Sequence, residues 1–70
     1  MEPYKLTLRD KIYLFFQDDT IKRKEYLFPK VEEQQFNYFN NNGIHIPVNF
    51  DRYISNYVDC LIFEYDLRKW

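Results

Sequence analysis

The chain has 70 residues, of which 46% are hydrophobic, 30% charged and 21% aromatic. So short a chain forms a single domain over residues 1–70, because a second hydrophobic core would not fit. The aromatic content excludes an intrinsically disordered chain, and no apolar run reaches the ~18 residues of a membrane span. A single cysteine excludes an internal disulfide and no signal peptide is visible, so we expect a cytoplasmic protein without a membrane partner.

The net charge of −1 is unevenly distributed along the chain. Residues 1–30 carry seven basic and five acidic side chains, whereas residues 31–70 carry three basic and six acidic ones. So low a charge does not support strong phosphate-driven binding, and we do not expect a nucleic-acid partner. Fifteen aromatic side chains cannot all be covered in so small a core. The excess predicts an exposed aromatic surface that binds a partner protein or forms a homodimer.

The first third of the chain favours β-strands. Residues 4–9 alternate between apolar and polar side chains, which is typical of a half-buried strand. Residues 12–17 are β-branched or aromatic and apolar on both faces, as in a central strand, and residues 20–28 would complete a hairpin. A second interpretation stays open, in which Thr7 is the N-cap of a helix and Asp10 completes its capping box.

A short helix is predicted over residues 31–41. Pro29 ends the hairpin, and acidic residues then come early, where they complement the helix dipole. Phe36 and Phe39 are three apart and therefore share a face. Gly43 follows the run, where a left-handed residue would end the helix.

The last third of the chain is ambiguous. We expect a loop or helical turn over residues 47–56 and a strand over 58–66, because the second segment is rich in strand formers. A continuous helix over residues 50–66 is the alternative, since the apolar residues there also fit a helical period. The predicted fold is therefore α+β, a small antiparallel sheet with one main helix. The alternative is a mostly helical small bundle.

Residues that carry chemistry are scarce, so we predict no catalytic residue, no metal site and no cofactor. His45 and Cys60 are the only histidine and cysteine, and metal sites need several such ligands. We expect a buried, inert thiol at Cys60 and a partly buried, structural imidazole at His45. The chain is therefore not expected to be an enzyme.

One basic segment could contact nucleic acid. A cluster of charged side chains lies close to an aromatic ring, as in surfaces that bind single strands by backbone contacts and stacking. The residues of this alternative site are Lys22, Arg23, Lys24 and Tyr26. A charged, solvated strand that prevents edge-to-edge aggregation accounts for the same residues.

Several segments resemble the small uracil-DNA glycosylase inhibitors of Bacillus phages. The similar residues are Leu14-Phe15-Phe16-Gln17-Asp18-Asp19, then Lys24 and Tyr26, the helix with Glu33, Phe36 and Phe39, and Val58-Asp59 before Leu61-Ile62. The resemblance implies an antiparallel sheet with one helix, a dimer, and binding in the DNA groove of a host repair enzyme. It also implies that Phe36 and Phe39 cap a pocket for an inserted apolar side chain. Asp18, Asp19, Glu32 and Glu33 would mimic phosphates.

A second resemblance favours the helical alternative. The stretch from Phe28-Pro29-Lys30 through Gly43 to Phe50-Asp51 is similar to the YozE-type helical domains of low-GC Gram-positive bacteria.

These observations predict a non-catalytic protein-binding module, acting in the host cytoplasm as a phage-encoded inhibitor. Its target would be a host enzyme such as uracil-DNA glycosylase, whose substrate groove it would occupy with Phe36, Tyr38 and Phe39. The alternatives are a small nucleic-acid-binding accessory protein and a structural oligomer subunit without an inhibitory target.

Overall fold

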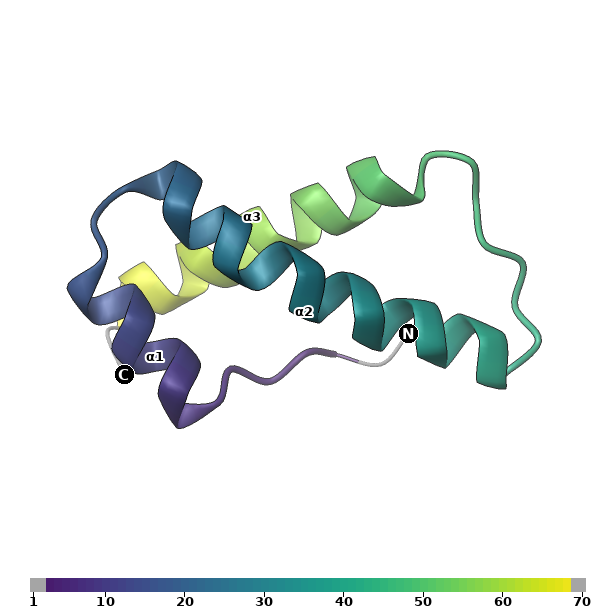
Figure 1. The fold of residues 1–70 in the computed structure, drawn as a ribbon, viewed down its shortest axis with the longest axis horizontal. Helices are drawn as coiled ribbons and strands as arrows, with labels where there is room; N and C mark the ends of the chain where they lie inside the picture. The colour runs from purple at the N-terminus through teal and green to yellow at the C-terminus, as the bar shows by residue number, and fades with distance from the viewer. Residues whose placement is uncertain (1–2, 69–70) are drawn as a thin grey trace.

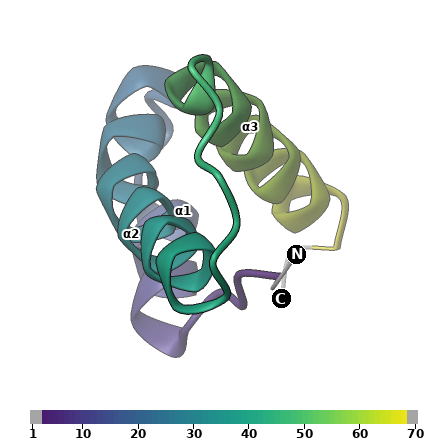
Figure 2. The ribbon, with the colours of Figure 1, turned by 90° about the vertical axis from the view of Figure 1, so that its right-hand side faces the viewer.

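The computed structural model describes residues 3–68, which form three helices and no strand. In chain order these are α1 (Leu8–Phe16), α2 (Thr20–Asn41) and α3 (Phe50–Arg68), as Figure 1 shows. The two long helices pack against each other, and α1 packs against α2. In Figure 2, viewed from one end, α2 and α3 lie on opposite sides, and the loop between them closes the near end.

The predicted α+β fold is therefore wrong, and the helical bundle that was its alternative is confirmed. The expected strands over 12–17 and 20–28 lie in α1 and the first half of α2. Of the expected strand over 4–9, residues 4–7 lead into α1 and residues 8–9 belong to it. Residues 12–17 resembled a central strand because they are apolar on both faces. In α1 that pattern arises because the exposed face of the helix is apolar as well.

α1 begins at the capping box that the second interpretation proposed. The backbone N–H of Asp10 donates to the Thr7 hydroxyl at 3.1 Å, and the backbone N–H of Thr7 donates to the Asp10 carboxylate at 3.1 Å. The two bonds satisfy donors that a helix start leaves open. They fix the direction in which the N-terminal segment enters α1.

α2 is a single helix that runs through the predicted helix over 31–41 and the predicted strand before it. Asp19 caps its start, accepting hydrogen bonds from the next turn. Buried residues recur every four positions, at Arg23, Leu27, Val31 and Gln35. The sequence pattern hid this period because two of the four side chains are polar. Pro29, expected to end a hairpin, lies inside α2 and is exposed, so the prediction of a break there is wrong.

The end of α2 agrees with the sequence. Gly43 has a φ of 67°, and its N–H donates to the carbonyl of Asn40 at 3.2 Å. The N–H of Ile44 reaches the carbonyl of Phe39 at 2.8 Å. These two bonds form a Schellman motif, in which a left-handed residue satisfies the last carbonyls of the helix.

α3 replaces both the predicted turn and the predicted strand of the last third. The continuous helix over 50–66 was the alternative, and it is confirmed. Burial follows the helical period along one face, with buried residues at Phe50, Ile54, Val58, Ile62 and Tyr65. The β-branched residues favoured a strand by intrinsic propensity, but packing against α2 outweighs that small preference.

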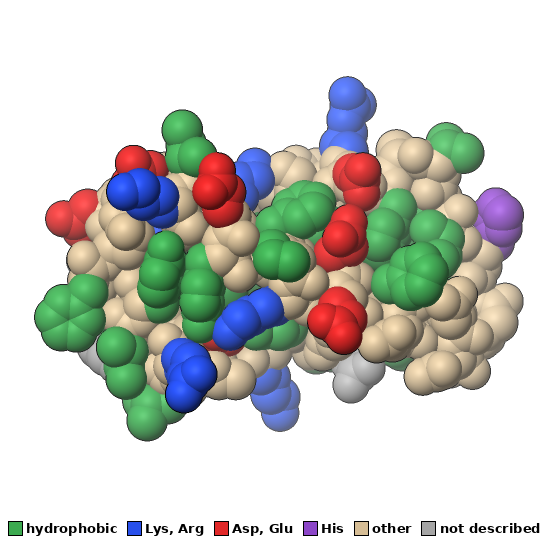
Figure 3. Space-filling model, viewed as in Figure 1, with side chains coloured by type: hydrophobic (Ala, Val, Ile, Leu, Met, Phe, Trp, Pro, Cys, Tyr) green, Lys and Arg blue, Asp and Glu red, His purple; other side chains and the backbone are tan. Residues whose placement is uncertain are grey.

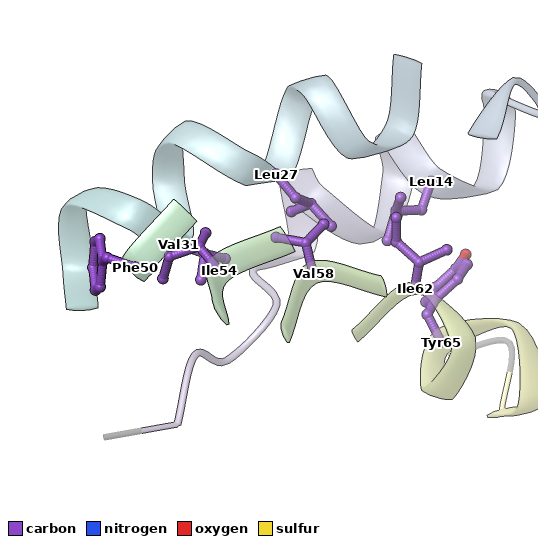
Figure 4. Close-up of a cluster of buried hydrophobic side chains, with 8 residues drawn as sticks. All are labelled: Leu14, Leu27, Val31, Phe50, Ile54, Val58, Ile62 and Tyr65. Carbon is purple, nitrogen blue, oxygen red and sulfur yellow. The ribbon is translucent and has the colours of Figure 1, made fainter. Parts of the chain in front are cut away.

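The core is a row of side chains along the contact between α2 and α3, closed at one end by α1 (Figure 4). Leu27 and Val31 project from α2, Leu14 from α1, and the five buried residues of α3 from the opposite side. Tyr4 and Leu6 of the N-terminal segment pack against this cluster. The Tyr4 N–H also donates to the Tyr57 hydroxyl at 2.7 Å, which ties the segment to α3.

A buried carboxylate joins α1, α2 and the N-terminal segment. Asp10 is fully buried, and its side chain accepts hydrogen bonds from the Tyr4 hydroxyl at 2.7 Å, the Tyr26 hydroxyl at 2.8 Å and the Lys30 ammonium at 2.9 Å. The Tyr26 ring also stacks on Tyr13, with ring centres 4.1 Å apart. The carboxylate is thus both buried and satisfied, as a buried charge has to be.

The protonation of this cluster follows from its contacts. Burial alone would raise the pKa of Asp10, but hydrogen bonds from Tyr4, Lys30, the Thr7 backbone and Tyr26 outweigh burial and lower it to about 2. Burial, together with the hydrogen bond to Asp10, raises the pKa of Tyr4 to about 12. Hydrogen bonds to Tyr26 and Asp10 raise the pKa of Lys30. At neutral pH Asp10 is therefore a carboxylate, Lys30 an ammonium and Tyr4 a neutral phenol.

Candidate functional site

A groove lies between the middle of α2, the loop after it and the start of α3. Its volume is about 570 Å³. Apolar and acidic side chains line it together, namely Pro29, Glu32, Glu33, Phe36, Ile46, Phe50 and Asp51. Figure 3 shows such a mixture of acidic and hydrophobic side chains over the central part of the molecule. We call these seven residues the acidic groove.

The helical period of α2 builds one wall of the acidic groove. Pro29, Glu32, Glu33 and Phe36 are spaced by three, one and three residues, which places them on one side of the helix. The opposite wall comes from the first turn of α3, where Asp51 complements the helix dipole. Phe36 keeps 46% of its surface exposed, which is high for a large aromatic ring.

Two carboxyl groups meet across the acidic groove. Burial raises the pKa of Glu32, and the hydrogen bond and negative charge of Asp51 raise it further. The two negative charges repel each other, so a cation placed between them would be favoured. The contact joins residues of two different helices, and the groove is therefore a product of the tertiary fold.

The structure brings together three of the residues that the sequence singled out for protein binding. Glu32, Glu33 and Phe36 all line the acidic groove. Phe39 does not join them, because it turns toward the core, with its ring centre 5.7 Å from that of Phe50. Tyr38 is half-buried and lies edge-on to Phe39, with the two ring centres 6.0 Å apart.

The other two acidic residues of the predicted site lie elsewhere. Asp18 and Asp19 are in the connection between α1 and α2, where Asp19 caps the longer helix. Glu33 follows Asp19 by fourteen residues, which is about 21 Å along a helix. A single acidic surface made of all four carboxylates is therefore not assembled.

Three of the four residues of the alternative basic site bind other side chains or backbone groups of the same chain. Arg23 is buried and binds both carboxylate oxygens of Asp66 at 3.1 Å, and it also donates to the backbone carbonyls of Leu14 and Gln17. Lys24 pairs with Asp59 at 3.2 Å. The Tyr26 hydroxyl donates to the Asp10 carboxylate, and the Tyr26 ring stacks on Tyr13. Lys22 is exposed and has no part in these interactions.

The two potentially reactive side chains differ from their predicted surroundings. Cys60 is exposed on α3, so the expectation of a buried thiol is wrong, and His45 is exposed in the loop before α3. Within residues 3–68, no three acidic, histidine or cysteine side chains are grouped so that they could hold a metal ion. None of the helices in this range is long and apolar enough to cross a bilayer.

Four residues of the acidic groove escaped the sequence analysis. Pro29 was interpreted only as a breaker. Phe50 and Asp51 lay in the segment 47–56, which was expected to be a loop or helical turn, and Ile46 lay just before that segment. The apolar period from Phe50 onward was the one signal that could have placed the start of α3 near α2. No family model, curated protein or solved structure matches this chain, so the arrangement itself is the basis for assigning a function.

Proposed function

We propose that this chain is a non-catalytic protein-binding module whose acidic groove takes a short basic and apolar segment of a partner protein. The observation that carries the proposal is that Glu32, Glu33 and Asp51 line one groove together with the exposed ring of Phe36. An arginine or lysine of the partner would lie between the carboxyls. A neighbouring apolar side chain would pack on Phe36.

The surroundings of the acidic groove support binding. Charged hydrogen bonds are stronger than neutral ones, and a guanidinium can serve two carboxylates at once. The apolar floor of Ile46 and Phe50 would supply desolvated area, and an exposed aromatic ring is a common anchor at interfaces. The lone histidine and the lone cysteine lie in different elements, which gives no support to a catalytic alternative.

The proposal keeps the protein-binding role expected from the sequence but does not name uracil-DNA glycosylase as the partner. That target came with a resemblance that implied an antiparallel sheet, and residues 3–68 contain no strand. Inhibition of a host enzyme would be one use of such a module. The chemistry of the acidic groove defines the bound segment rather than the protein that carries it.

A peptide array tests the acidic groove directly. Peptides that place arginine or lysine beside leucine or phenylalanine should bind with a Kd of roughly 10–100 μM, and glutamate analogues should not. The variant Glu33→Lys with Phe36→Ala should abolish binding. The matched control, Glu64→Lys with Phe63→Ala on the exposed face of α3, should bind like the unmodified chain. Equal binding by both variants, or no preference for basic peptides, would overturn the proposal.

A further inference from the structure

α1 carries a second, apolar surface, none of whose residues lines the acidic groove. Leu8, Ile12, Phe15 and Phe16 are 68%, 44%, 51% and 77% exposed. Their spacing of four, three and one residues confines them to an arc of about 100° on the helix. We call these four residues the outer stripe. The opposite side of α1 carries the buried Asp10 and Leu14, so the helix is apolar on the face that does not contact the core.

The outer stripe matches the seam of a helix pair. Leu8, Ile12 and Phe15 follow the alternating four- and three-residue steps by which helices pack side by side. Its exposed area is about 500 Å², taking roughly 200 Å² for each large side chain. An interface of the standard size buries about 800 Å² per copy and is roughly 60% non-polar, so the outer stripe matches the non-polar area that such an interface needs.

Charges at the two ends of the outer stripe are opposite in sign. Arg9 is exposed and flanks the stripe near its N-terminal end, whereas Asp18 is exposed and follows its C-terminal end. A two-fold axis between Ile12 and Phe15 would bring the Arg9 end of one stripe to the Asp18 end of the other, twice. A parallel pair would instead place like charges together. The surface is therefore complementary to itself in the antiparallel orientation, as a two-fold interface requires.

We propose that the chain forms a two-fold dimer in which the outer stripes of two copies pack antiparallel. The acidic groove is lined from Pro29 onward on α2 and does not include α1, so each copy keeps its groove open. The net charge of −1 opposes the association only weakly. A lipid surface is the less favoured occupant, because Asp18 and Asp19 at one end of the stripe would be repelled by anionic headgroups.

Sedimentation equilibrium of the full chain tests the dimer, which should form at micromolar concentration with a Kd of roughly 1–50 μM. Ile12→Glu and, separately, Phe16→Ser should each raise the Kd at least 30-fold, since each change occurs twice in a symmetric interface. Both positions are exposed in one copy, so helical circular dichroism should be retained. Phe63→Ser with Leu67→Ser, two exposed residues of α3, should leave the Kd within about two-fold.

A charge exchange tests the orientation. Arg9→Asp and Asp18→Arg should each weaken the homodimer about five-fold, and mixing the two variants should restore association as a heterodimer. A monomeric chain, a dimer that the stripe variants leave unchanged, or a dimer broken only by the α3 variant would overturn the proposal. Binding of the monomer to phosphatidylserine vesicles through Phe16 would also overturn it. Peptide binding should persist in Ile12→Glu, so failure of the dimer and failure of the acidic groove are separate results.

Discussion

The ammonium of Lys30 lies 2.9 Å from the carboxylate of Asp10, and the acid is fully buried whereas the base is half-exposed. The pair connects α1 to α2 at a point where few apolar side chains of α1 reach the core. A buried charge that loses its partners is far more costly than the pair is stabilising. The helix contact therefore depends on the whole cluster around Asp10.

Replacing Asp10 by asparagine should lower the free energy of unfolding by about 3 kcal/mol. The amide keeps the shape of the side chain but removes the charge that faces Lys30. It also loses acceptor capacity toward the Tyr4 and Tyr26 hydroxyls. Urea denaturation followed by circular dichroism measures the loss. Glu64→Gln, at an exposed position of α3, is the matched control and should change stability by less than about 0.5 kcal/mol.

Stability should fall in acid because the pKa of Asp10 is lowered from 3.8 to about 2 on folding. The unfolded chain binds the proton more readily, so the stabilisation is complete above about pH 4 and is lost as the pH falls toward 2. The contribution is about 2 kcal/mol, at 1.36 kcal/mol per pKa unit. The difference between the unmodified chain and Asp10→Asn should shrink over this window. A constant difference would contradict the pKa shift.

Arg23→Lys should destabilise the protein by about 2 kcal/mol although the charge is kept. A single ammonium cannot replace both hydrogen bonds to Asp66 and also reach the carbonyls of Leu14 and Gln17. Lys24→Ala removes a more exposed ion pair and should cost less than about 0.5 kcal/mol. Thermal unfolding of the two variants side by side compares them. Equal losses of stability in the two variants would show that the buried hydrogen bonds of Arg23 add nothing to the stability of the fold.

Gly43→Ala should cost about 1 kcal/mol, because the residue has a φ of 67°. A Cβ atom there would meet nothing within 4 Å, so the cost is conformational and not steric. Gly43→Asn should cost less, since asparagine tolerates left-handed backbone better than alanine does. Chemical denaturation of both variants measures the order. Alanine and asparagine variants of equal stability would contradict it.

Local chemistry predicted the ends of the helices better than it predicted their type. The capping box of Thr7 and Asp10 was recognisable because its donors and acceptors are three residues apart, and Gly43 was recognisable by its backbone freedom. Residues 12–17 were wrongly predicted as a strand because the outer stripe makes the solvent-exposed side of α1 apolar as well. The hydrophobic pattern alone could not indicate which face of α1 turns inward.

The sequence predicted three of the seven residues that line the acidic groove. Glu32, Glu33 and Phe36 share a stretch of α2 and were identified together, since neighbours along one helix remain neighbours in any fold that keeps the helix. Asp51 was missed because it reaches Glu32 only when α3 packs on α2. Phe39 was assigned to the binding surface, but the rings of Phe50 and Tyr53 draw it toward the core.

By itself the sequence indicated short-range features: the capping box at the start of α1, as one of two interpretations, the end of α2 at Gly43 and a surplus of aromatic side chains. Those features depend on bonds and spacings within a turn or two of the chain. Only the tertiary structure decided that Asp10 is buried, that Glu32 and Asp51 line one groove and that the outer stripe stays exposed. Such contacts join residues far apart in sequence. They are selected by the burial of the α2–α3 core, which no local pattern encodes.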